Sequence, residues 1–344
     1  MVDTLLTISN LTVDFGTDDG NVHAVRGIDL VVNDGEILAV VGESGSGKSV
    51  SMLSVLGLHP KGRTTITGRI DWKGENLLDA GTERLRNVRG DEISMIFQDP
   101  LTALNPVHRV GYQITEMLHA HREMSRSEAN ERAVEALRSV GIPQPETRVR
   151  SYPHEFSGGM RQRAMVAMAL SCDPTLIIAD EPTTALDVTV QAQVLELLAS
   201  AAREGGRAMI LITHDLGVVA GLADRVVVMY AGRVVEEGLV YGLFADPTHP
   251  YTVGLLQSLP RLDSDDGELI PIAGQPPSML APPPGCAFHP RCPLADEAAG
   301  CMTVIPELVD VGEGHRSACH RIAEVPLLLG GVGRRDADPT EVTS

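Results

Sequence analysis

The strongest constraint in this sequence is a loop at residues 42–49 that matches the G-x-x-x-x-G-K-[ST] pattern of phosphate-binding loops. The apolar run 37–41 precedes it and is typical of a buried strand, and apolar residues follow it at helical spacing. A loop between a strand and a helix N-terminus can turn its backbone N–H groups toward phosphate oxygens. Because the flanks are correct, a chance glycine-rich turn is a poor alternative, and we expect nucleotide phosphates to bind here.

The loop residues have separate predicted roles. Lys48 would reach the β- and γ-phosphates of a nucleotide, and the Ser49 hydroxyl would bind Mg²⁺. Glycines and small residues leave the backbone free to curl around the phosphates. The predicted phosphate contacts are therefore Gly42, Ser44, Gly45, Ser46 and Gly47.

Size and charge limit the class of protein. The chain has 344 residues and 43% hydrophobic content, enough for one large domain with an appendage or for two domains. Its net charge of −18 disfavours a nucleic-acid surface, because phosphates are neutralised by clustered Lys and Arg. We expect no membrane span, since no apolar run reaches about 18 residues. The N-terminus lacks the pattern of a signal peptide, which predicts a cytoplasmic protein.

Hydrophobic periodicity divides the chain into regions. Period-two alternation over residues 1–36 indicates an antiparallel β-subdomain, and residues 101–156 are predicted to be largely helical. From residue 157, buried apolar runs alternate with helical patterns, which predicts an α/β fold with a parallel sheet and helices outside it. The expected elements are helices over 161–170 and 188–204, strands over 175–179 and 208–213, and a hairpin over 226–235.

Three further stretches place polar residues at strand ends. Asp180 and Glu181 end one apolar run, where Asp180 would hold Mg²⁺ and Glu181 would polarise an attacking water. Gln98 follows another strand and could reach Mg²⁺ or water. His214 ends a third strand and would lie beside the γ-phosphate. In isolation an acidic turn, a solvated glutamine and a structural histidine are the simpler readings of these residues.

A fourth stretch suggests a second anion site. Ser157 is a good helix N-cap, and Gly158 and Gly159 free the backbone for close approach to a ligand. Taken alone, a plain helix cap explains the pattern. One chain with two anion-binding helix ends, however, suggests that two copies of such a chain share their sites.

In this order the stretches resemble the nucleotide-binding subunits of ABC transporters over roughly residues 5–245. The resemblance implies an ABC-type P-loop NTPase fold with an antiparallel β-subdomain, a helical subdomain at about 101–165 and a small irregular Cys-rich C-terminal extension. The matching motifs are the Walker A loop at 42–49, the Q-loop Gln98, the signature 157–162, the Walker B strand 177–181, the D-loop 184–187 with Asp187, and the H-switch His214.

The same resemblance implies a mechanism. Two subunits would pack head to tail, with ATP and Mg²⁺ held between the Walker A loop of one and the signature helix of the other. Glu181 and His214 would be catalytic, and Mg²⁺ would be bound through Ser49, Gln98 and Asp180. The nucleotide would also meet the partner's Ser157, Gly158, Gly159 and Asp187, while Phe15 would lie under the adenine ring unless it is an ordinary core residue.

Several stretches are similar to the dipeptide and oligopeptide importer branch of this family. They include residues 97–106, 152–160 and 249–260. The resemblance implies an ATPase at the cytoplasmic face of the cell membrane, peripheral to it, that powers import of di- or oligopeptides. Its implied partners are a second ATPase subunit in a heterodimer, two transmembrane permeases and an extracytoplasmic peptide-binding protein.

Other functions stay open from the sequence. Nickel importers share much of the same pattern, so the cargo could be nickel. A soluble ABC protein acting on ribosomes or DNA is a rival, although such proteins usually carry two cassettes or long helical insertions. A mainly structural ATP-binding partner is a third, and the intact Glu181 and His214 argue against it.

Four cysteines gather near the end of the chain with the spacing C-x₅-C-x₈-C-x₁₇-C. No C-x-x-C pair occurs among them, which disfavours a zinc finger, and disulfides fit a cytoplasmic protein poorly. Unrelated free thiols are an alternative, but the Pro-rich segment is too short for its own core, which suggests a metal staple. The resemblance implies a [4Fe–4S] cluster bound by Cys286, Cys292, Cys301 and Cys319. We expect an extension over 246–330 and a disordered tail over 331–344.

Overall fold

The computed structural model describes residues 3–184, 186–259, 271–312 and 314–329. The predicted disordered tail at 331–344 lies outside the described residues. The strands are β1 (Thr4–Thr17), β2 (Gly20–Asn33), β3 (Ile37–Val41), β4 (Thr64–Trp72), β5 (Glu75–Asn76), β6 (Ile93–Ile96), β7 (Leu176–Asp180), β8 (Ala208–Thr213), β9 (Arg225–Tyr230), β10 (Arg233–Leu239), β11 (Val309–Gly312) and β12 (His315–Ser317). The helices are α1 (Lys48–Val55), α2 (Thr82–Asn87), α3 (Pro100–Ala103), α4 (Val110–His121), α5 (Arg126–Ser139), α6 (Pro145–Arg148), α7 (Gly158–Leu170), α8 (Val188–Glu204), α9 (Leu216–Leu222), α10 (Val240–Ala245) and α11 (Pro250–Gln257), with short 3₁₀ or π turns at Val88–Glu92, Pro153–Glu155, His289–Arg291 and Ile322–Leu329.

The strands form two sheets. In the described part of the chain, one has four antiparallel strands in the order β2-β1-β4-β5, and the other has eight in the order β11-β12-β10-β9-β3-β8-β7-β6. Strands β6, β7, β8, β3 and β9 run parallel, and β10 returns antiparallel to β9. These arrangements confirm the predicted antiparallel β-subdomain, parallel sheet and hairpin.

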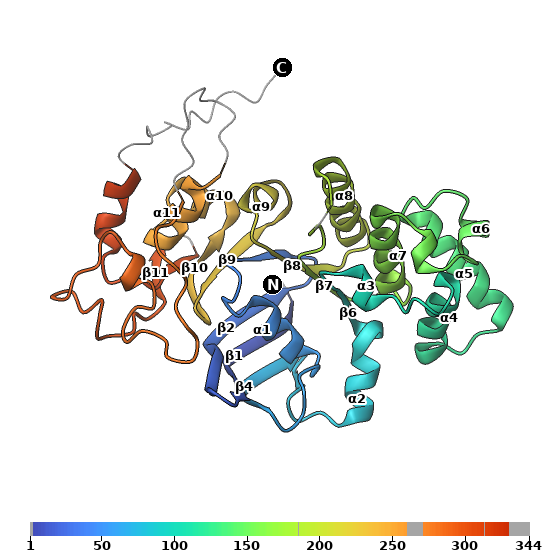
Figure 1. The fold of residues 1–344 in the computed structure, drawn as a ribbon, viewed down its shortest axis with the longest axis horizontal. Coiled ribbons are helices and arrows are strands. Elements are labelled where there is room, and N and C mark those ends of the chain that lie inside the picture. Colours follow the sequence, from blue (N-terminus) through green and yellow to red (C-terminus); the bar gives the residue numbers. More distant parts are fainter. Residues whose placement is uncertain (1–2, 185, 260–270, 313, 330–344) are drawn as a thin grey trace, which may run out of the picture.

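The main sheet is buried on both faces because its strands are apolar throughout. Along β3, Leu38 and Val40 pack with the β-subdomain and α1, while Ile37, Ala39 and Val41 pack with the helices of the other face. Figure 1 shows α1 and the β-subdomain on one side of this sheet and α8, α9 and α10 on the other. Such a strand cannot shift along its neighbours without misplacing a row of apolar side chains, so the loop that follows it is held rigidly.

The helical subdomain and the C-terminal extension lie at opposite ends of the molecule (Figure 1). The helical end contains α4, α5 and α6 and packs on α7. Ser125 caps α5 by accepting a hydrogen bond from Glu128 N at 3.2 Å, as its sequence pattern predicts. Helix α7 runs past residue 165, where the sequence predicted the end of this subdomain. The domain limits stay predictions.

The extension is more regular than its composition predicts. Strand β12 pairs antiparallel with β10, and β11 pairs with β12, so the extension adds two strands to the main sheet. Glu236 of β10 is fully buried and joins the two parts. Its carboxylate accepts hydrogen bonds from Thr248 N at 2.6 Å, His249 N at 3.1 Å and His315 Nε2 at 2.8 Å. Proline-rich composition hid this pairing from the sequence.

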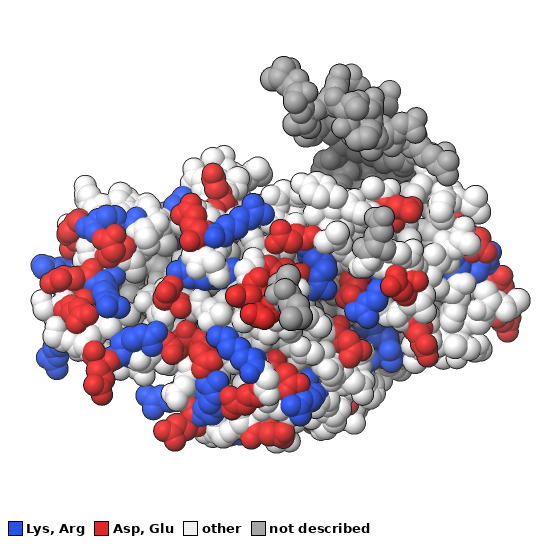
Figure 2. Space-filling model, turned by 180° about the vertical axis from the view of Figure 1, so that it is seen from behind, with Lys and Arg blue, Asp and Glu red and all other residues white. Residues whose placement is uncertain are grey.

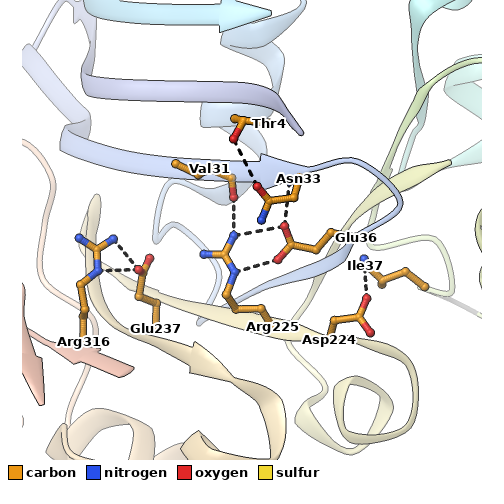
Figure 3. A network of polar contacts seen from close by, with 9 residues as sticks. All are labelled: Thr4, Val31, Asn33, Glu36, Ile37, Asp224, Arg225, Glu237 and Arg316. Atoms are coloured by element: carbon orange, nitrogen blue, oxygen red, sulfur yellow. Dashed lines mark hydrogen bonds and ion pairs between the residues drawn. The ribbon is translucent and has the colours of Figure 1, made fainter. Parts of the chain in front are cut away.

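A polar network fixes the turn that leads into β3 (Figure 3). Arg225 Nε donates to Glu36 Oε1 at 2.8 Å, and Glu36 Oε2 accepts from Asn33 N at 2.8 Å. The Asp224 carboxylate accepts from Ile37 N at 2.9 Å. Because Arg225 and Glu36 are largely buried, the turn is tied to β9 at the point where the strand before the phosphate loop begins.

The surface carries mixed charge. Figure 2 shows Lys and Arg side chains interspersed with Asp and Glu on the face that it presents. In the described parts of the chain, no helix combines the length and the apolarity that a membrane crossing needs.

Candidate functional site

The phosphate loop needs glycine at two positions for steric reasons. Gly42 has φ +149°, and a Cβ on it would lie 2.2 Å from the Met229 carbonyl oxygen. Gly47 has φ +99°, and its Cβ would lie 2.6 Å from the Ala24 carbonyl oxygen. Contacts under 3 Å to backbone atoms cannot be relieved by a side-chain rotation. The loop is therefore pressed against β9 and β2, which leaves its other side open.

Lys48 lies at the first position of α1, and its side chain folds back over the loop. The Nζ donates to the carbonyl oxygens of Gly42 at 2.6 Å and Glu43 at 3.0 Å. Burial lowers the pKa of Lys48, although carboxylates including Glu181 and Asp180 act in the opposite direction. A largely desolvated ammonium held only by carbonyl oxygens is well prepared to bind an anion.

Ser49 and Asp180, the two residues predicted to bind Mg²⁺ from the loop and from the strand end, are in direct contact. The Ser49 hydroxyl donates to Asp180 Oδ1 at 2.8 Å, which joins the N-terminus of α1 to the end of β7. Burial raises the pKa of Asp180, and the Ser49 hydrogen bond opposes that shift. A hydroxyl and a carboxylate at this distance are the hard oxygen ligands that Mg²⁺ prefers.

Glu181 collects contacts from three other segments. Gln98 Nε2 donates to its Oε2 at 3.0 Å, Thr184 Oγ1 donates to the same oxygen at 3.1 Å, and His214 Nδ1 lies 3.6 Å from its Oε1. Its backbone has φ +43°, a conformation that few residues other than glycine adopt. The strand end is therefore bent so that the carboxylate turns toward Gln98 and His214.

These residues enclose a single cavity of about 540 Å³. The Ser46 hydroxyl, which lines it, is buried and lacks a hydrogen-bond partner among the described residues. An unpaired buried hydroxyl beside a desolvated ammonium suits the oxygens of a phosphate group. The lining consists of Glu43, Ser44, Gly45, Ser46, Gly47, Lys48, Ser49, Val50, Gln98, Glu181 and His214.

The remaining predicted nucleotide contacts lie elsewhere. Ser157 caps α7 by accepting from Met160 N at 3.3 Å, and both Ser157 and Gly158 are exposed. Asp187 caps α8 by accepting from Val190 N at 3.0 Å and is exposed as well. Phe15 packs edge-on against His59, with ring centroids 5.4 Å apart. Of the described residues, those that line the cavity include none of these.

Glu43 is a residue of the loop to which sequence reasoning gave no role. Its carboxylate pairs with Arg291 through two hydrogen bonds, at 2.6 and 3.0 Å, and its N–H donates to the Tyr251 hydroxyl at 2.8 Å. Both partners belong to the C-terminal extension. One signal was available, because a carboxylate in a loop that binds an anion calls for a neighbouring cation.

The four cysteines of the extension line one small cavity, together with His249. In the parts of the chain that the structure describes, no three His, Cys, Asp or Glu side chains are grouped closely enough to hold a metal ion, so the predicted cluster site is not preformed. Burial raises the pKa of Cys292 to about 11 and that of Cys319 to about 12.

One residue that lines this cavity, His249, has a ring nitrogen without a hydrogen-bond partner in the described structure. His249 is buried, its Nδ1 accepts a hydrogen bond from Tyr251 N at 3.1 Å, and its Nε2 has no partner in the described structure. With Nδ1 accepting, the proton of a neutral ring sits on Nε2. The four thiols and the unpartnered His249 nitrogen therefore belong to residues that line the same small cavity.

Comparison with known proteins extends over nearly the whole chain. The family model described as ABC transporter matches residues 25–184, and that described as oligopeptide/dipeptide transporter, C-terminal region, matches residues 235–301. The dipeptide transport ATP-binding protein DppD of Bacillus subtilis is 50% identical over 316 residues, which cover 92% of this chain and 94% of that protein. The oligopeptide transport ATP-binding protein OppD of Salmonella typhimurium is 50% identical over 321 residues, 93% of this chain and 94% of that protein.

Among solved structures, a dimeric post-hydrolysis state of the ATP-binding cassette MJ0796 bound to ADP and Pi matches with a TM-score of 0.62. It is 27% identical and covers 68% of this chain and 98% of that one.

Proposed function

Since this chain belongs to the ATP-binding subunits of ABC transporters, in the dipeptide and oligopeptide branch, and is an ATP-hydrolysing transport subunit, we propose a specific role for each residue of its site in driving peptide import. The observation that carries the proposal is that residues of several motifs, from Glu43 to His214, line one cavity. Transfer of the γ-phosphoryl group to water depends mainly on positioning and charge stabilisation, which such a cavity can supply.

The phosphate loop and Lys48 hold the triphosphate. Ser49 and Asp180 would hold Mg²⁺, with Gln98 near enough to share it through water. Bound there, Mg²⁺ neutralises charge that develops between the phosphates. Lys48 would exchange its carbonyl contacts for phosphate oxygens, a gain that its desolvated state favours.

Glu181 acts on the attacking water. Its Oε2 is held by Gln98 and Thr184, so the carboxylate is oriented before a nucleotide arrives. His214 is two-thirds exposed and lies 3.6 Å from the other oxygen, which suits a side chain that turns toward the γ-phosphate. Gln98 connects Mg²⁺, the water and the segment that follows β6.

A second ATPase subunit completes the site. Ser157, Gly158 and Gly159 lie at a capped, exposed helix N-terminus that has no nucleotide of its own. We propose that they contact the ATP held by the partner's phosphate loop in a head-to-tail dimer, with Asp187 at the same interface. The mate is a similar but distinct ATPase subunit.

The permeases dock beside Gln98. Phe97, the residue before Gln98, lines a cavity of about 170 Å³ whose other lining side chains are mainly apolar, among them Met95, Met117, Met165 and Met168. Methionine-rich surfaces adapt to the helices of a partner. Leu101 is 59% exposed on α3, three residues after Gln98. Docking of two permeases here would place the subunit at the cytoplasmic face of the membrane, and a separate extracytoplasmic protein would deliver the peptide.

The extension holds a [4Fe–4S] cluster on Cys286, Cys292, Cys301 and Cys319. The shared cavity and the unpaired His249 N–H support this, since a cationic cluster would stabilise the thiolates. The role of the cluster would be that of a structural staple.

Hydrolysis is tested by Glu181→Gln. The variant should lose ATP turnover and retain ATP binding, whereas Glu196→Gln on the exposed face of α8 should behave as wild type. Undiminished turnover in Glu181→Gln would refute the role of this residue.

Transport coupling is tested by copurification. The chain should purify with two polytopic membrane proteins, and peptide with its binding protein should stimulate ATPase activity. Leu101→Asp should weaken the complex, while Leu239→Asp, at a residue 58% exposed in β10, should not. Stimulation by nickel instead of peptide would favour the nickel importer, and isolation without membrane proteins would favour a soluble ABC protein.

The cluster is tested by iron and acid-labile sulfide analysis of anaerobically purified protein. Cys292→Ser should lose both, and Cys172→Ala, which lies in the helical end of the core, should keep both. Neither iron nor sulfide in the wild-type protein would remove the cluster from the proposal.

A further inference from the structure

The extension reaches into the phosphate loop through one arginine. Arg291 ends the short turn His289–Arg291, and its side chain is only 4% exposed. Its two terminal nitrogens donate to the two oxygens of Glu43 at 2.6 and 3.0 Å. Its Nε donates to the Ala273 carbonyl oxygen at 2.9 Å, which fixes the plane of the guanidinium. A buried bidentate pair of this kind specifies geometry as well as charge.

A second contact holds the backbone of the same loop residue. The Tyr251 hydroxyl accepts a hydrogen bond from Glu43 N at 2.8 Å. Tyr251 is fully buried and packs on Tyr230 and Phe288, with ring centroids 4.6 and 5.4 Å away. The extension therefore binds both parts of Glu43. Arg291 binds its carboxylate, and Tyr251, which belongs to a packed aromatic cluster, binds its backbone N–H.

Glu43 is badly placed for a site that binds a polyanion unless its charge is neutralised. It lines the nucleotide cavity, and its carbonyl oxygen accepts from Lys48 Nζ at 3.0 Å. An unpaired carboxylate here would repel the phosphates and compete for Lys48. The ion pair with Arg291 neutralises that charge.

We propose that Arg291 and Tyr251 are positioning residues for ATP binding, through which the C-terminal extension holds the phosphate loop of the ATPase domain in its binding conformation. The inference rests on the proposed ATPase function and adds a role for the extension in it. It requires no particular state of the cysteines.

The test is steady-state ATPase kinetics of the assembled transporter with Arg291→Ala, Glu43→Gln and the double variant. Arg291→Ala leaves the Glu43 charge unpaired, so KM for MgATP should rise about tenfold while kcat falls less than about twofold. Glu43→Gln removes that charge, so the double variant should have a KM close to that of Glu43→Gln alone. Tyr251→Phe removes a single acceptor and should raise KM about threefold.

The controls separate positioning from folding. Arg316→Ala breaks an ion pair between β12 and Glu237 that does not touch the loop, and it should leave KM unchanged. A merely structural role for Arg291 would lower the active fraction, and hence kcat, with KM intact. It would also leave Arg291→Ala without rescue by Glu43→Gln.

A wild-type KM in both Arg291→Ala and Tyr251→Phe would overturn the inference. So would a double variant whose KM exceeds that of Arg291→Ala. A wild-type complex that shows no ATP hydrolysis would instead overturn the proposed function, so the two failures are distinguishable.

Discussion

The left-handed backbone at Glu181 predicts an unusual response of stability to mutation. Residues with side chains are disfavoured at φ +43°, and glycine is not. Glu181→Gly and Glu181→Ala both remove the carboxylate and its bonds to Gln98 and Thr184. The two variants therefore differ only in whether the residue at this position carries a Cβ.

The expected difference follows from two opposing terms. A left-handed conformation costs a residue with a Cβ roughly 1–2 kcal/mol. Glycine loses roughly 0.5–1 kcal/mol more conformational entropy than alanine on folding. Glu181→Gly should therefore be more stable than Glu181→Ala by about 0.5–1 kcal/mol. This order is the reverse of that expected in a helix, where Ala220→Gly on the exposed face of α9 should cost about 1 kcal/mol.

Urea unfolding can measure the difference. The fluorescence of Trp72, the only tryptophan of the chain, reports on the β-subdomain, where the residue is fully buried. Both variants should lack ATP hydrolysis, so stability and activity separate. If Glu181→Gly proved equal to Glu181→Ala or less stable, the strand end would not be strained. In that case, the positive φ of Glu181 would not be a strained conformation that orients its carboxylate.

Two further predictions follow from the same geometry. Gly42→Ala should abolish ATP binding measured by calorimetry, because its Cβ would lie 2.2 Å from a backbone oxygen. A Cβ in Gly45→Ala would meet nothing within 4 Å, so this variant should weaken ATP binding by no more than about tenfold. Equal ATP affinities of the two variants would contradict the steric argument. In iron-free protein, the pKa of Cys292, raised to about 11, keeps the thiol protonated at pH 8. Its alkylation by iodoacetamide should therefore be roughly a hundredfold slower than that of an exposed cysteine, and a rate near that of free cysteine would contradict its burial.

Local patterns predicted the elements of the fold well. The helix expected over 188–204 and the strand expected over 208–213 have the limits of α8 and β8. Caps or turns lie within a few residues of the ends of both elements, and the pattern of apolar residues is uninterrupted in each. Helix α7 begins three residues earlier than expected, at Gly158, because Ser157 caps it.

Contacts between distant segments could not be predicted in the same way. Arg291 and Glu43 are 248 residues apart, and neither the loop motif nor the cysteine spacing links them. Strand β12 has only three residues, and it pairs with β10 at the point where Glu236 of β10 binds His315 of β12. Such pairings arise from tertiary packing and leave no periodic signal, so sequence reasoning treated the extension as a separate appendage.

The charges around the nucleotide cavity bear on the proposed mechanism. Lys48 is the one lysine or arginine among the described lining residues, against the carboxylates of Glu43 and Glu181, while the buried Asp180 adjoins them. Arg291 neutralises Glu43, but the remaining carboxylates outnumber the cation, and ATP itself is strongly anionic. Tight binding therefore calls for positive charge from outside the chain. In the proposed mechanism, Mg²⁺ would supply it beside Asp180, and a helix N-terminus of a partner subunit would supply it at the γ-phosphate. Under that proposal, the charge distribution of a single chain would make hydrolysis depend on assembly of the dimer.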